Sequence, residues 1–169
     1  GYDDPRQAIE TCGMVEEMLS DEILTRITGK LKWADRCEDV AFNSLPAAFT
    51  ADMKALRYLT APNMPQSDKQ PKSPGIQNGS NMYEMNPLDH RCCQHNAGHG
   101  WPYYAQNLWY ATPDNGLAAI LYSASEVTAK VADGSKVTIK EKTRYPFEEE
   151  VVFTVFADHK VRFPLYLRV

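Results

Sequence analysis

The sequence predicts an α+β fold in which helices come first and antiparallel strands come last. Apolar residues recur at helical spacing up to about residue 115, and from there they alternate with a period of two. The turn signal Pro113-Asp114-Asn115-Gly116 separates the two patterns. We therefore expect two structural units, residues 1–115 and 116–169. At 169 residues and 43% hydrophobic composition, the chain is long enough for one ordinary domain or two small ones.

Three helices are expected in the first fifty residues. The first begins near residue 11, and its apolar stripe consists of Met14, Val15, Met18 and Leu19. A second helix is predicted for residues 23–27 and stops at Gly29. A third covers residues 32–44, contains a cysteine expected to be buried (Cys37), and is ended or kinked by Pro46.

The middle of the chain predicts a loop and then one more helix. Pro, Gln, Asn, Ser and Gly dominate residues 61–87, which predicts a long loop, either a rim over a pocket or a mobile segment. The helix is predicted for residues 100–111. Strands follow, with Asp133-Gly134 as a hairpin signal; they are predicted for residues 117–123, 126–131, 136–140, 151–156 and 161–167.

Charge and hydropathy exclude several classes of partner. The formal net charge is −4 and no basic run interrupts the sequence, which argues against binding to nucleic acid or to anionic lipid. No apolar stretch reaches transmembrane length. The aromatic run Trp101-Pro102-Tyr103-Tyr104 suits stacking against sugar rings, and it equally suits a packed helix.

Three of the four cysteines lie in two short motifs, Glu10-Thr11-Cys12 and Cys92-Cys93. Adjacent cysteines form only a strained disulfide, whereas two neighbouring thiolates, a remote thiolate and a carboxylate can complete one tetrahedral Zn²⁺ shell. The alternative is that these cysteines are reduced and packed as small hydrophobic residues. A helix through Glu10 and Cys12 would separate their side chains by about 200°, so joint binding requires the helix to begin after Glu10.

Spacing alone leaves the role of such a metal open. A closed shell of three thiolates and one carboxylate is more often structural, since a thiolate that donates to Zn²⁺ has less electron density for a substrate. Zinc also keeps a thiolate available at neutral pH, which favours a nucleophile. His90, His95 and His99 surround the paired cysteines and either orient a ligand or are solvated.

The chain resembles glycoside hydrolase family 127, the β-L-arabinofuranosidase-like enzymes. The motifs that carry the resemblance are Glu10-Thr11-Cys12, the helix from Trp33-Ala34-Asp35 to Asn43, Arg91-Cys92-Cys93-Gln94-His95-Asn96, Thr143-Arg144-Tyr145-Pro146 and Phe163-Pro164-Leu165-Tyr166-Leu167-Arg168. Members of the family carry an (α/α)₆ barrel followed by β-sandwich domains. The resemblance implies that residues 1–115 are the last helices of the barrel and residues 116–169 the start of an antiparallel β-sandwich.

The resemblance also implies a site. In the family a Glu and three Cys hold Zn²⁺, and the first cysteine of the pair attacks the anomeric carbon in a retaining reaction. The corresponding ligands here are Glu10, Cys12, Cys92 and Cys93, with Cys92 as the nucleophile. His90 matches a histidine that contacts the sugar, and Tyr58 matches a tyrosine that lines the pocket.

The general acid/base does not match any residue of the chain. The family's glutamate lies upstream of the E-x-C motif, and only nine residues precede Glu10. We therefore expect a fragment that is inactive by itself and whose apolar residues Met14, Val15 and Met18, exposed by the truncation, are covered by another chain or by rearranged packing. The rival hypothesis is a non-catalytic carbohydrate-binding or structural module with a structural zinc. The sugar, the linkage and the compartment stay open.

Overall fold

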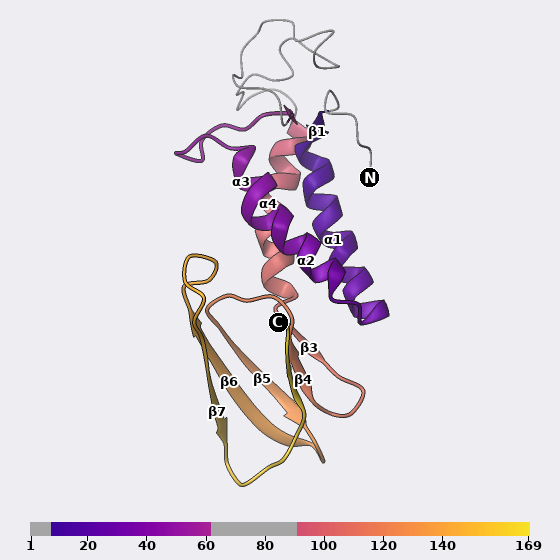
Figure 1. Cartoon of the computed structure of the whole chain (residues 1–169), viewed down its shortest axis with the longest axis vertical. Helices are drawn as coiled ribbons and strands as arrows, with labels where there is room; N and C mark the ends of the chain where they lie inside the picture. Colours follow the sequence, from indigo (N-terminus) through magenta and orange to yellow (C-terminus); the bar gives the residue numbers. More distant parts are fainter. Residues whose placement is uncertain (1–7, 62–90) are drawn as a thin grey trace, which may run out of the picture. The chain divides into compact units, whose positions relative to one another are not determined.

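The computed structural model describes residues 8–61 and 91–169, and it confirms the predicted α+β class (Figure 1). Of the long predicted loop, residue 61 alone is among these residues, and His90 lies outside them. The chain divides into two units, one of Gly1–Asp21 and Arg36–Tyr103 and one of Glu22–Asp35 and Tyr104–Val169. Within residues 8–61 and 91–169, no helix combines the length and the apolar character needed to cross a membrane.

Helix α1 is a single helix, Thr11–Thr28, and the prediction of two separate helices in this region is wrong. The polar residues at its middle are accommodated inside the helix. Ser20 donates its hydroxyl to the carbonyl oxygen of Glu16 at 2.7 Å, while Asp21 and Glu22 are 3% and 2% exposed. The predicted stop is confirmed, because Gly29 follows the helix with φ of 66°.

The third predicted helix runs as three consecutive segments: α2 (Lys32–Asp39), the π-helical turn η1 (Val40–Ser44) and α3 (Leu45–Ala47). The wide turn takes the usual α-helical donor away from the carbonyl oxygen of Ala41. The Leu45 N–H donates to the carbonyl oxygen of Val40 instead, and Pro46, the next residue, has no N–H to donate. The indole N–H of Trp101 occupies this acceptor at 3.0 Å. The aromatic cluster around Trp101 is therefore used for packing in this unit.

Helix α4 spans Arg91–Gln106, so the prediction of a helix over residues 100–111 is wrong at both ends. Gly98 and Gly100 lie in the middle of this helix. A Cβ on Gly100 would lie 2.5 Å from Leu45 Cδ2, so this position admits no side chain where α4 packs on its neighbours. Residues Trp109–Ala111 form strand β3 instead of a last helical turn.

The core of the first unit contains the apolar stripe of α1. Met14, Val15 and Met18 are 3%, 0% and 0% exposed, so packing within the chain covers them and no second chain is needed for that. They are buried between helices because α1 and α4 approach closely at Gly100, whose Cβ position is 3.4 Å from Val15. Cys37 is fully buried, as predicted.

The second unit contains two three-stranded sheets. Strands β5 (Ser125–Val131), β6 (Ser135–Thr143) and β7 (Val151–Ala157) form an antiparallel meander (Figure 1), and Gly134 has φ of 104° in the predicted hairpin turn. The other sheet has the order β3-β4-β8, with β4 at Leu117–Ala119 and β8 at Leu165–Leu167. Here β8 pairs parallel with β4, an exception to the antiparallel pattern. The core of the second unit includes Leu117, Val131, Val137 and Ile139.

Candidate metal centre

Four side chains from two distant parts of the sequence converge in the first unit. Glu10, Cys12, Cys92 and Cys93 each offer one ligand atom, and these atoms all lie within 4.8 Å of one another. The Sγ atoms of Cys12 and Cys93 are 3.3 Å apart, and Cys93 Sγ is 3.7 Å from Glu10 Oε1. All four cysteines of the chain are free thiols.

A change of secondary structure inside the Glu10-Thr11-Cys12 motif makes this convergence possible. Glu10 ends the two-residue strand β1 (Ile9–Glu10), and α1 begins at the next residue. The expectation that the helix starts after Glu10 is therefore confirmed. An extended residue followed by a helical one lets both side chains point to the same place, which a continuous helix would forbid.

The start of each of two helices contributes thiols to the cluster. Cys12 is the second residue of α1, and Cys92 and Cys93 lie in the first turn of α4. The first turn of a helix carries partial positive charge and stabilises a thiolate. Burial acts in the opposite direction, since it raises the pKa of the Cys12 thiol and, more strongly, that of the Cys93 thiol. Cys93 is fully buried and Cys92 is exposed.

The four donors fit a tetrahedral zinc shell. With Zn–S bonds of about 2.3 Å, two thiolates of a tetrahedron are roughly 3.8 Å apart, which is the scale of the distances within the cluster. Three thiols and one carboxylate are also the soft, anionic donor set that Zn²⁺ takes in proteins. A divalent cation would offset the repulsion and the burial that oppose ionisation of these groups. The residues present therefore fit a bound zinc ion.

Tyr58 lies beside the cluster on the segment that precedes strand β2 (Leu59–Thr60). Its side chain packs with Cys93 and its neighbours. The pKa of the Tyr58 hydroxyl is raised, first by burial and then by the nearby carboxyl group of Glu10 and the thiols. Tyr58 is thus a neighbour of the candidate ligands, whereas His90 lies outside the described residues.

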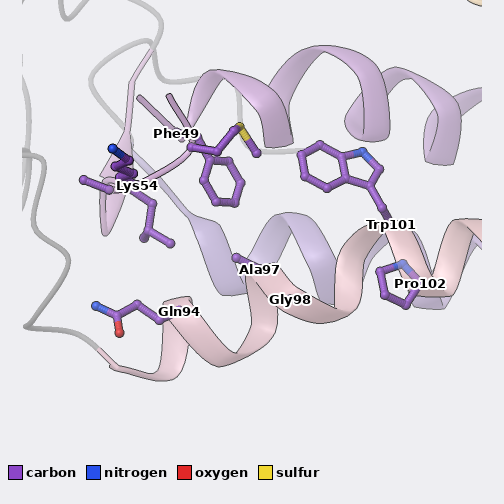
Figure 2. Close-up of a pocket in the computed structure, with 10 residues that line it drawn as sticks. Phe49, Lys54, Gln94, Ala97, Gly98, Trp101 and Pro102 are labelled. Atoms are coloured by element: carbon purple, nitrogen blue, oxygen red, sulfur yellow. The ribbon is translucent and has the colours of Figure 1, made fainter. Parts of the chain in front are cut away.

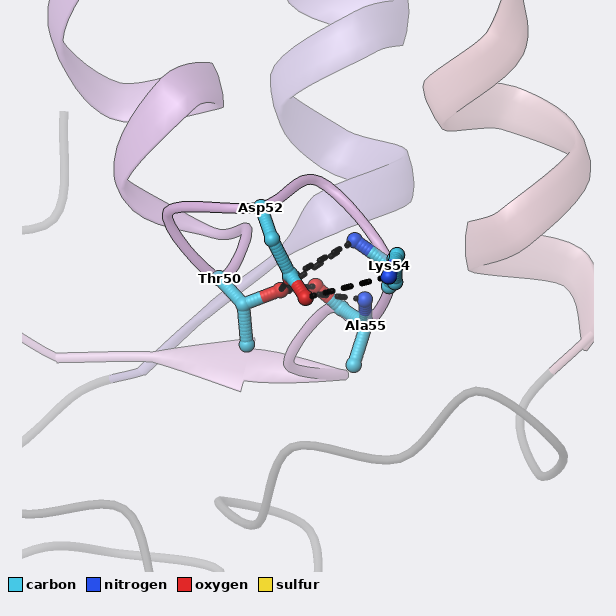
Figure 3. A network of polar contacts seen from close by, with 4 residues as sticks. All are labelled: Thr50, Asp52, Lys54 and Ala55. Carbon is cyan, nitrogen blue, oxygen red and sulfur yellow. Dashed lines mark hydrogen bonds and ion pairs between the residues drawn. The ribbon is translucent and has the colours of Figure 1, made fainter.

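A polar turn fixes the start of the segment that carries Tyr58. Figure 3 shows the Thr50 hydroxyl donating to Asp52 Oδ1 at 2.6 Å while it accepts the N–H groups of Lys54 and Ala55 at 3.2 Å and 3.1 Å. The turn holds Met53 at φ of 60°. A hydroxyl that satisfies several backbone groups stabilises such a turn. The turn therefore fixes where the segment that carries Tyr58 begins.

Asn96 is a further residue of the site that the sequence reasoning did not assign. A hydrogen bond from its side chain lowers the pKa of the Cys12 thiol, against the larger effect of burial. Asn96 is four residues after Cys92 on α4, so the two share a helix face. The spacing of four residues between Cys92 and Asn96 was the sequence signal that could have identified Asn96 as part of the site. His95 and His99 are exposed on the same helix, and the His99 ring is 5.7 Å from that of Tyr103.

A cavity of about 420 Å³ lies on another face of α4 (Figure 2). Gln94, Ala97, Gly98 and Trp101 line it at helical spacing, and the Phe49 ring stacks on Trp101 at 5.8 Å. Two residues along a helix turn the side chain by about 200°, so Gln94 points away from the direction of Cys92. The cavity is therefore separate from the exposed thiol. A hollow of about 770 Å³ in the second unit is lined by none of the predicted site residues.

Two family models of known proteins match the chain. Residues 1–106 match the family model of the GH127 catalytic domain of β-L-arabinofuranosidases, and residues 116–169 match the model of the GH127 middle domain. These matches define a glycoside hydrolase chain. It belongs to glycoside hydrolase family 127. No curated protein sequence matches the chain.

Solved structures support the same fold. The chain superposes on a GH127 β-L-arabinofuranosidase from Geobacillus stearothermophilus with a TM-score of 0.75 and 20% identity, covering 96% of this chain and 25% of that one. For the GH127 β-arabinofuranosidase BT3674 the TM-score is 0.74 with 19% identity, covering 96% and 23%. A further glycoside hydrolase gives 0.69 and 23% identity, covering 95% and 26%. The chain thus spans about a quarter of the length of these proteins.

Proposed function

We propose that this chain carries the zinc-thiolate part of a retaining glycoside hydrolase that acts on a β-L-arabinofuranoside-like glycan. Glu10, Cys12, Cys92 and Cys93 would hold one Zn²⁺, and Cys92 would be the nucleophile. One observation carries the proposal: four soft or anionic donors, up to 83 residues apart in sequence, have their ligand atoms within 4.8 Å. Family membership supplies the reaction class.

The exposure of the paired thiols supports Cys92 as the nucleophile. Cys92 is exposed, while Cys93 is fully buried against Leu56 and Ala97. A sugar can approach only a thiol that solvent reaches. Cys93 is therefore suited to hold an ion, and Cys92 is suited to meet a substrate. Tyr58, beside Glu10, would line the sugar pocket, and His90 would contact the sugar.

The reaction needs a second group besides the thiolate. Cys92 Sγ would bond to the anomeric carbon as the bond to the leaving oxygen breaks, and that oxygen must receive a proton from a general acid. The same group, now a base, would then activate the water that releases the sugar. Bound zinc would keep the cluster thiols ionised at neutral pH. Glu10 is the carboxylate of the cluster and is already a proposed ligand, so we propose that the acid/base comes from another part of the protein and that the isolated chain is inactive.

The domain organisation is part of the same proposal. Residues 1–115 would be the closing helices of an (α/α)₆ barrel, and residues 116–169 would begin a β-sandwich. The rival function, a non-catalytic carbohydrate-binding module with a structural zinc, shares the ligands but gives Cys92 no special reactivity. The reactivity of Cys92 therefore discriminates between the two functions.

Metal analysis tests the centre directly. Protein purified without chelator should contain about one zinc per chain, since one four-ligand shell holds one ion. Cys12→Ser should lose most of it. Cys37→Ser is the matched control, because Cys37 is buried outside the cluster and should leave the zinc content unchanged. A zinc-free protein, or a Cys12→Ser variant that retains its zinc, would overturn the proposed centre.

A further inference from the structure

Thr11 stands between two of the proposed ligands and is fully buried. Its amide N–H donates to the carbonyl oxygen of Tyr58 at 3.0 Å, and its hydroxyl donates to the carbonyl oxygen of Arg57 at 2.7 Å. The first amides of a helix have no partner within the helix, and a threonine hydroxyl there usually bonds to the helix's own backbone. Both donors of Thr11 instead reach one segment of another part of the chain, so they fasten the start of α1 to it.

The segment that receives these bonds is itself held from the other side. The Arg57 N–H donates to the carbonyl oxygen of Ala48 at 2.8 Å, and its guanidinium donates to the carbonyl oxygen of Ala47. Strand β2, which follows, pairs with β1 through Ile9↔Thr60 and Glu10↔Leu59 within the part of the chain that the structure describes. So short a ladder is weak by itself. The two bonds of Thr11 therefore strengthen the connection between the Glu10-Cys12 motif and the segment that carries Tyr58.

We propose that Thr11 is a positioning residue for the metal centre. By binding the carbonyl groups of residues 57 and 58, it holds the Glu10 carboxylate and the Cys12 thiol within reach of Cys93 before any ion binds. The inference rests on the proposed function, because it assumes that the cluster binds zinc. A ligand set held in place by its surroundings binds metal more tightly than one that must be gathered by the ion. The same bonds also fix the backbone of Tyr58.

Zinc affinity, measured by competition with a chromophoric chelator, tests the inference without any enzyme assay. Thr11→Val keeps the branched shape and removes the hydroxyl, and it should weaken zinc binding about tenfold. Thr11→Ser retains the hydroxyl and should bind zinc almost as tightly as the unmodified chain. Thr25→Val replaces another buried threonine later in α1 and should leave the affinity unchanged.

The outcomes separate the two levels of the proposal. If the unmodified chain binds zinc and Thr11→Val binds it equally well, the positioning role is wrong and the metal centre stands. If the unmodified chain binds no zinc, both proposals fall. A loss in Thr11→Val that Thr11→Ser does not restore would also count against the hydroxyl.

Hydrogen exchange on the unmodified chain keeps the inference testable even if Thr11→Val does not fold. In zinc-free protein, the Thr11 amide should exchange slowly because it is already bonded to Tyr58. Exchange at the rate of an unstructured peptide without zinc, with protection appearing only after zinc is added, would mean that the ion, rather than Thr11, assembles the motif.

Discussion

Replacing Gly100 by alanine should destabilise the first unit. The new Cβ would stand 2.5 Å from Leu45 Cδ2, whereas carbon atoms in contact are normally about 3.5–4.0 Å apart. Leu45 is fully buried and has little room to turn away. Overpacking of this kind costs about 1–3 kcal/mol, and alanine returns up to about 1 kcal/mol of helix propensity. We expect the free energy of unfolding to fall by up to about 2 kcal/mol.

Gly98→Ala is the matched control, because it lies on the same helix and its Cβ would meet nothing within 4 Å. It should raise the free energy of unfolding by up to about 1 kcal/mol. Urea unfolding followed by far-ultraviolet circular dichroism measures both variants, and their midpoints should move in opposite directions. A Gly100→Ala variant that unfolds at the same urea concentration as Gly98→Ala would refute the close packing of α4 on α3.

Three further predictions concern other parts of the chain. Burial raises the pKa of Glu141, so its protonated form stabilises the fold below about pH 4.5, and that contribution is lost as the pH rises through the raised pKa. In urea unfolding, Glu141→Gln should therefore gain stability relative to the unmodified protein from about pH 4 to pH 7. A difference in stability that does not change with pH would contradict this. A furanose-based electrophile should alkylate exposed Cys92 at least about tenfold faster than buried Cys37 by peptide mapping, and equal labelling would leave only a structural zinc. Gly134→Ala should lower the free energy of unfolding by about 1–2 kcal/mol because φ there is 104°. Thermal unfolding measures this loss of stability. Gly29→Ala, at φ of 66°, should lose less stability.

The strands of the meander were predictable because their pattern is local, whereas the strands predicted for residues 117–123 and 161–167 are shorter in the structure. Alternation identified β5 and β7 to within about one residue, and Asp133-Gly134 marked the hairpin correctly. The parallel pairing of β8 with β4 joins segments about 48 residues apart and has no local signature. The shortest strands, β1 and β2, consist of two residues each and leave no period to read.

The helices show where local reasoning fails. The sequence pattern predicted no helix immediately before residue 100, yet Gly98 and Gly100 both lie inside α4. Tertiary packing against Leu45 explains the glycine at position 100, and propensity alone could not reveal that contact. The separation of α1 into two helices failed for a similar reason, because Asp21 and Glu22 are polar residues buried in the helix interior.

The candidate ligands could be named from sequence because thiols and a carboxylate in two short motifs are uncommon and chemically specific. Their convergence followed from one physical condition, that the helix begin after Glu10, and that condition is met. Thr11 carried no such chemical signal, and for Asn96 the sequence offered only its spacing from Cys92. Each acts through a hydrogen bond to a residue whose position only the folded chain fixes.

The bond between Trp101 and the Ala41 carbonyl makes two distant positions depend on each other in evolution. With Pro46 in place, a substitution that removes the indole N–H leaves an acceptor unpaired at a cost of about 1–3 kcal/mol. A chain that first exchanges Pro46 for a residue with an N–H can supply that donor from its own backbone. The order of the two changes then decides whether the intermediate is viable. A homologue without the tryptophan should therefore also lack the proline.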